Sequence, residues 1–101
     1  MIMDFLREEF ESWRRTLPES AVPELEVFPL PEGADKQSAR VRVETPARIA
    51  DLLVWDSGEA DLTAASLVTG EIEVMENAEV TTRFGIRGLL EDLARAVGDV
   101  G

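Results

Sequence analysis

The chain has 101 residues, of which 45% are hydrophobic and 31% are charged, so it has enough apolar material for one modest core and a single domain over residues 1–101. It contains no cysteine and no histidine. Their absence excludes disulfides and zinc sites with sulfur ligands, and it removes the side chain that most often transfers protons near neutral pH. The 21 acidic and 10 basic residues give a net charge of −11, which repels phosphate backbones and anionic lipids. We therefore expect no nucleic-acid and no membrane partner.

No apolar stretch approaches the roughly 18 residues of a membrane-spanning helix, and the N-terminal segment mixes both signs of charge instead of forming a secretion signal. Together with the missing cysteine, this pattern favours a cytoplasmic protein. Gly58 and Gly70 are not followed by the Gly-Lys-Ser/Thr pattern of a phosphate-binding loop. We expect no cofactor.

The first predicted element is an amphipathic helix over residues 2–17. Its large apolar residues recur in steps of three and four and so form one stripe, and the helix should close at Thr16 or Leu17 because Pro18 disfavours helical geometry in the residue before it. Residues 25–28 lie between a loop at 18–24 that contains two prolines and a loop at 29–38 that contains two prolines and a glycine. We interpret them as a short edge strand.

The remaining elements complete a mostly antiparallel meander. Residues 38–45 alternate as a half-buried strand does, and the apolar run at 49–55 fits a central strand that is covered on both faces or bulged. Two further strands should meet near Gly70, and a last helix should start after Thr81 or Thr82 and end before Gly98. The predicted fold is α+β: a helix, about five antiparallel strands and a second helix, with both helices on one sheet face.

The hairpin near Gly70 determines which side chains share a face. If Gly70 adopts the left-handed conformation of a three-residue loop, the apolar residues Leu62, Ala64, Ile72 and Val74 lie on one face. The opposite face then collects four acids: Glu59, Asp61, Glu71 and Glu73. A two-residue turn would break this pattern.

Charge is unevenly distributed along the chain. Residues 51–82 contain eight acids and no base, whereas a surface that only maintains solubility usually mixes the two signs. We interpret this region as a docking surface for a basic protein, with a solvated acidic face as the alternative. The candidate partner-binding residues are Trp55, Asp56, Glu59, Asp61, Glu71 and Glu73. Trp55 itself fits either the core, which we favour, or an exposed interface. Arg40 and Arg42 are expected on the same outer face, where they would partly offset the acids.

Two chemical alternatives receive less support. Paired carboxylates can perform acid–base chemistry when a dry pocket raises the pKa of one of them, but a flat outer sheet face offers no such pocket. The segment from Asp56 to Asp61 lacks the spaced acids and late glutamate of a calcium loop, and turn formation explains it better. We expect no enzymatic activity and no metal.

The stretch Val54-Trp55-Asp56-Ser57-Gly58-Glu59-Ala60-Asp61-Leu62, followed by Thr69-Gly70-Glu71, resembles a motif of small bacterial immunity proteins called TriTu. The resemblance implies a domain with a helix at each end that binds and occludes a type VI secreted toxin, an ADP-ribosyltransferase that modifies elongation factor Tu. An acidic adaptor domain for another basic protein is the alternative, and a toxin gene beside this one would decide against it.

Overall fold

A computed structural model describes residues 2–28 and 36–98 of the chain. Most of the loop expected at 29–38 therefore lies outside the described residues. The described elements follow in the order α1 (Ile2–Trp13), η1 (Arg14–Thr16), β1 (Val22–Phe28), β2 (Ser38–Glu44), β3 (Arg48–Trp55), β4 (Glu59–Ser66), β5 (Ile72–Glu79) and α2 (Arg83–Gly98).

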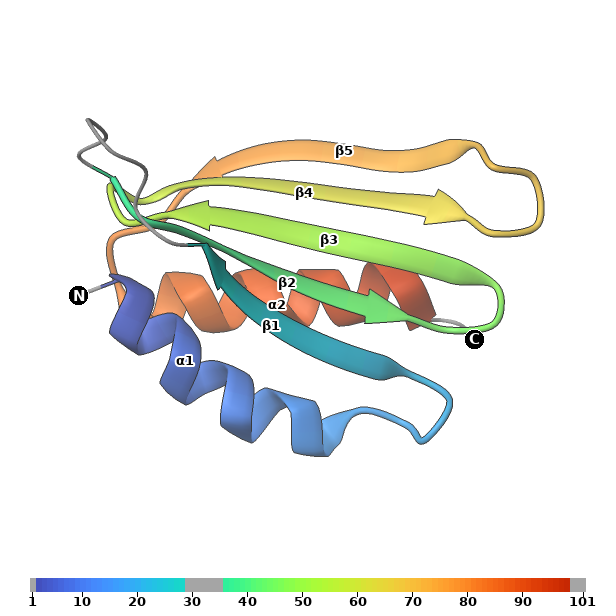
Figure 1. Ribbon diagram of the computed structural model, residues 1–101, viewed down its shortest axis with the longest axis horizontal. Coiled ribbons are helices and arrows are strands. Elements are labelled where there is room, and N and C mark those ends of the chain that lie inside the picture. The colour runs from blue at the N-terminus through green and yellow to red at the C-terminus, as the bar shows by residue number, and fades with distance from the viewer. Residues whose placement is uncertain (1, 29–35, 99–101) are drawn as a thin grey trace.

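The five strands form one antiparallel sheet in the order β1-β2-β3-β4-β5, and both helices pack on the same face of it (Figure 1). This arrangement confirms the predicted α+β fold. Neither α1 nor α2 has the length and apolar content to span a bilayer, a finding that holds for the described residues.

The helix ends follow the signals in the sequence. α1 tightens into the short 3-10 helix η1, and Leu17 is already extended in front of Pro18. α2 begins after Thr82, whose Oγ1 accepts a hydrogen bond of 3.0 Å from the backbone N–H of Gly85. Because the first N–H groups of a helix have no partner within it, this contact stabilises the start of α2. Of the two threonines after which this helix was expected to start, Thr82 is the one whose side chain makes the capping contact.

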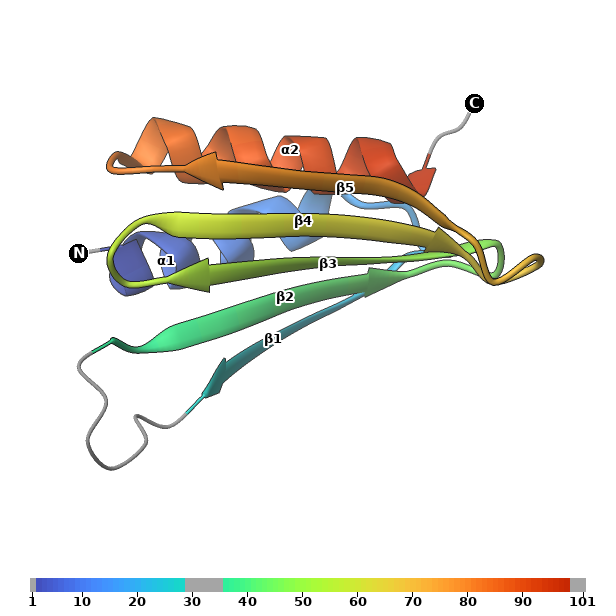
Figure 2. The same ribbon diagram turned by 90° about the horizontal axis from the view of Figure 1, so that it is seen from above.

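The core lies between the helices and the inner sheet face. α2 packs against β2, β3 and β4. α1 lies beside α2 (Figure 2). Alternation along the strands sends every second side chain into this layer, so Val41, Leu52 and Leu62 lie in register across three strands. The largest fully buried side chains are Leu6, Leu52, Ile86, Leu90, Leu93, Val41, Val43 and Val54.

The expected register of the β4–β5 hairpin is partly wrong. Gly70 has the left-handed φ of +80°, as predicted, but the turn spans residues 67–71 and the ladder shifts by a bulge at Ala64/Ala65. The Ser66 hydroxyl accepts hydrogen bonds from the backbone N–H groups of Val68 and Thr69, which stabilises this wider turn. As a result Val74 faces the core opposite Ala64, whereas Ile72 pairs with Ala65 and is exposed.

Candidate binding surface on the open sheet face

The outer face of the sheet has no helix over it among the described residues, and it carries both charged and apolar side chains. Its central strand β3 contributes Ile49, Asp51, Leu53 and Trp55, all of them half-buried. β3 is therefore covered on one face only, and the bulge considered for it lies in the β4–β5 ladder. Trp55 lies on the open face and outside the core, which corrects the interpretation we favoured.

Ion pairs partly offset the negative charge on the β1–β3 side of this face. The Arg42 guanidinium donates to both carboxylate oxygens of Asp51, at 2.7 and 3.3 Å, and Arg40 pairs with Glu26 at 2.8 Å. The hydrogen bonds to Asp51 raise the pKa of Arg42 above its ordinary value. Arg40 and Arg42 thus occupy the outer face as predicted and offset acids there.

The four acids that we expected to share a patch lie at opposite ends of the β4–β5 hairpin. Glu59 opens β4 and faces Glu79, and Asp61 faces Asn77, whereas Glu71 lies in the far turn and Glu73 beside the bulge. β4 advances about 3.3 Å per residue, so its seven steps from Glu59 to Ser66 span roughly 23 Å. Figure 1 shows the two ends well separated, with the β4–β5 turn projecting past the end of α2. The prediction of one patch is wrong because Glu59 and Asp61 lie at one end of the antiparallel β4–β5 pair and Glu71 and Glu73 lie at the other, a separation that the width of the turn does not change.

Part of the predicted set does come together. A shallow hollow of about 480 Å³ is lined by Trp55 and by residues from the paired ends of β4 and β5: Glu59, Ala60, Asp61, Asn77, Ala78 and Glu79. Asp56 is exposed in the turn between β3 and β4. Asn77 Nδ2 donates a hydrogen bond to Asp61 Oδ1, which orients that carboxylate at the floor of the hollow. Asn77 and Glu79 were absent from the predicted set.

Glu59 and Glu79 are directly opposite one another, an arrangement that destabilises a sheet by like-charge repulsion. Lys36 offsets it by donating a hydrogen bond of 2.9 Å to Glu59 Oε1, and Ser57 donates a second one of 3.1 Å. These two contacts lower the pKa of Glu59, so that carboxyl stays ionised at neutral pH. The hollow therefore presents negative charge rather than a protonated acid.

Bases from other parts of the chain neutralise some of the acids at 51–82. Arg42 pairs with Asp51, Lys36 with Glu59, and Arg48 Nε with Glu73 Oε1 at 2.7 Å. Three of the eight acids are thus paired. Within the described residues, the remaining five have no ion pair: Asp56, Asp61, Glu71, Glu76 and Glu79. Two of these five, Asp61 and Glu79, line the hollow, whereas Glu76 lies on the side of β5 that faces α2.

This surface carries carboxylates beside one aromatic side chain. A carboxylate that acts as a general acid needs a raised pKa, and the pKa of Glu59 is displaced in the opposite direction. Among residues 2–28 and 36–98, no group of three or more acidic, histidine or cysteine side chains is arranged to hold a metal ion.

A larger hollow of about 750 Å³ opens where the two helices end, and its walls include Trp13, Leu17, Ala21, Ala94 and Val97. It contains none of the predicted binding residues. Its charged lining residues, Glu91 and Arg95, carry opposite signs, so it has no surplus of either charge. We therefore place the candidate site on the open sheet face.

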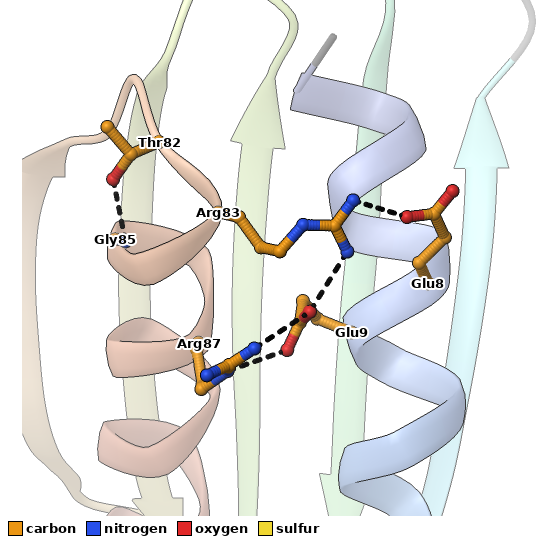
Figure 3. Close-up of polar contacts among 6 residues, drawn as sticks. All are labelled: Glu8, Glu9, Thr82, Arg83, Gly85 and Arg87. Atoms are coloured by element: carbon orange, nitrogen blue, oxygen red, sulfur yellow. Dashed lines mark hydrogen bonds and ion pairs between the residues drawn. The ribbon is translucent and has the colours of Figure 1, made fainter.

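Sequence reasoning missed a polar cluster that joins the helices (Figure 3). Glu9 on α1 is buried, and its carboxylate accepts hydrogen bonds from Arg83 at 3.0 Å and from Arg87 at 2.9 and 3.3 Å, both on α2. Arg83 also pairs with Glu8 at 2.5 Å and lies over the ring of Phe5. Hydrogen bonds from Arg87 and then Arg83 lower the pKa of Glu9.

Two features of the sequence could have revealed this cluster. Glu9 interrupts the apolar stripe at a helical spacing from Leu6 and Trp13, so its side chain points toward the core and needs a charged partner. Arg83 and Arg87 are four residues apart and share one face of the last helix.

Searches of family models, curated proteins and solved structures found no match to this chain.

Proposed function

We propose that this chain is an immunity-type binding protein that captures a basic protein toxin on the open face of its sheet, at the hollow beside Trp55. The observation that carries this proposal is the position of Trp55. This large aromatic side chain is half-buried on an uncovered sheet face and borders a hollow that also contains Glu59, Asp61 and Glu79.

The two parts of this surface have different physical effects on association. An aromatic side chain beside a hollow provides contact area at little cost in conformational entropy, and such residues dominate binding energies at interfaces. The surrounding negative charge attracts a basic partner over a longer range and so raises the association rate. Trp55 is thus the proposed anchor, and the acids are the proposed steering charges.

The resemblance of the segment from Val54 to Leu62 to the TriTu motif makes an ADP-ribosyltransferase toxin the partner to test first. An acidic adaptor for another basic protein would present the same surface. A toxin gene next to the gene for this chain supports the immunity role, and a neighbouring gene for a basic protein that is not toxic favours the adaptor.

The test uses charge reversals at the two ends of one hairpin. Glu79→Lys changes the hollow, whereas Glu71→Lys changes the far turn by the same charge, and neither acid has an ion pair in the described structure. Cells expressing the adjacent toxin should lose protection with Glu79→Lys or Trp55→Ala and retain it with Glu71→Lys. Circular dichroism spectra of the three variants are compared with that of the wild type to test whether each variant is folded.

Equal protection by all three variants would refute the binding site at the hollow. Loss of protection with Glu71→Lys alone would instead place the interface at the far turn.

A further inference from the structure

β5 is an edge strand whose outer side pairs with no other strand in the described structure. Val80 N donates to Gly58 O at 2.7 Å, so the residue at 80 directs its N–H toward the turn before β4. In an antiparallel ladder this direction alternates from residue to residue. Met75, Asn77 and Glu79 therefore direct their N–H and C=O groups outward.

The two edges of the sheet differ in how well they resist pairing with another chain. β1, at the opposite edge, contains Pro23, which has no N–H to donate. β5 spans eight residues without proline, glycine, lysine or arginine, the residues that commonly block an edge. An added strand would also find room for its side chains in a hollow of about 340 Å³ that is lined by Val74 and Glu76 of β5 and by α2 residues, among which Arg95 is paired with Asp92.

Charge determines which strand can pair there. β5 carries Glu73, Glu76 and Glu79 and no base; Arg48 of β3 pairs with Glu73, and the other two have no ion pair in the described structure. If a second copy paired antiparallel about Glu76, that residue would face its own copy and Glu73 would face Glu79, so like charges oppose self-association. A basic strand would instead face these carboxylates with opposite charge.

We propose that β5 accepts an extended, lysine- or arginine-rich segment of the partner as a sixth strand, antiparallel to β5. This inference rests on the proposed function, since it names the part of the basic partner that docks beside the hollow. Main-chain hydrogen bonds to Met75, Asn77 and Glu79 hold the segment, and the glutamates select its charge.

The test uses the full chain and four synthetic peptides of eight residues with blocked ends. In the first, lysine alternates with valine. The second has glutamate in place of lysine, the third has the first sequence with alternate amides N-methylated, and the fourth is the first sequence in scrambled order. N-methylation keeps the charge and side chains but removes main-chain donors. Hydrogen exchange and amide shifts are followed by NMR at low salt.

The lysine–valine peptide should slow amide exchange at Met75, Asn77 and Glu79 and leave β1 unchanged. The N-methylated peptide should bind about tenfold more weakly or worse, because several main-chain hydrogen bonds are lost, and the glutamate peptide should not bind. The double variant Glu76→Lys/Glu79→Lys should reverse the preference between the lysine and glutamate peptides.

Equal binding of the N-methylated peptide, or no binding by any lysine peptide, would overturn strand addition. Shifts confined to Trp55 and its neighbours would overturn it too while supporting the open face as the docking site. If the β5 amides become more protected as the protein concentration rises, with no peptide present, a second copy of the chain is the occupant and the proposal is overturned. Toxin protection by the Glu79 and Glu71 variants tests the proposed function separately.

Discussion

Gly58 connects the turn after β3 to the end of β5. Its φ is +102°, and a Cβ built on it would lie 2.4 Å from the carbonyl oxygen of Val80. Its own carbonyl accepts the hydrogen bond from Val80 N at 2.7 Å. This contact holds two walls of the hollow together, because Trp55 lies just before the turn that contains Gly58 and Glu79 lies just before Val80.

Replacement of Gly58 by alanine should therefore destabilise the fold more than the same change at Gly70, the other glycine with positive φ. Gly70→Ala introduces only backbone strain, about 1 to 2 kcal/mol, because nothing lies within 4 Å of its added Cβ. Gly58→Ala adds a clash with backbone and should cost roughly 1 to 3 kcal/mol more. Urea unfolding measures both losses, and equal values would show that the turn can shift without affecting β5.

At the scale of elements, the Glu9 cluster joins the two helices through side chains of α1 and α2. Hydrogen bonds from Arg87 and then Arg83 to one buried carboxylate, together with their positive charges, lower the pKa of Glu9. Because its folded pKa is below the unfolded value, this interaction stabilises the fold above the unfolded pKa of about 4.5 and is lost as the pH falls through the folded value.

Glu9→Gln should lower the free energy of unfolding at pH 7, and the difference from the wild type should shrink as the pH falls below about 4.5. Arg87→Gln provides the matched control in a double-mutant cycle. It should destabilise the wild type at pH 7 but have a smaller effect in the Glu9→Gln background, and the coupling should vanish in acid. Coupling that persists below the folded pKa would show that the pair acts through packing rather than charge.

Hydrophobic periodicity predicted the order of the helices and strands and their layers, but not the start of β1, which begins at Val22 within the segment that we expected to be a loop. The apolar stripe of α1 and the alternation of β2 each leave one apolar face that must be buried. A helix layer packed on one face of a sheet satisfies both. The register of β4 and β5 could not be predicted in the same way. The Ser66 hydroxyl, which stabilises the wider turn, acts through local hydrogen bonds that leave no periodic pattern.

At the scale of the whole molecule, the candidate site was predicted only in part because its charges are balanced across the sheet. Lys36, Arg42 and Arg48 neutralise three acids of the segment 51–82 from outside that segment. A count along the sequence therefore overstates the local field. The prediction for Trp55 was wrong for a related reason. Alternation shows that the side chains of Trp55 and Val54 point to opposite faces of the sheet, but only the position of the helices shows which of these faces is covered.

The net charge of −11 remains the dominant long-range property of the molecule, and it should control the rate at which a basic partner associates. Raising the ionic strength from about 0.01 to 0.15 M shortens the Debye length from about 30 to 8 Å, so association should slow steeply over that range. If steering acts at the hollow, a charge removed there should matter more than one removed elsewhere.

Glu79→Gln and Glu19→Gln provide this comparison, because each removes one exposed acid. Glu79 lines the hollow, and Glu19 lies in the connection between η1 and β1. We expect Glu79→Gln to lower the association rate with the toxin by about twofold to fivefold at 0.01 M salt. Glu19→Gln should change it less, and both differences should narrow at 0.15 M. Stopped-flow mixing measures the rates. Equal effects of the two variants would mean that only net charge steers association and that the hollow has no special part in it.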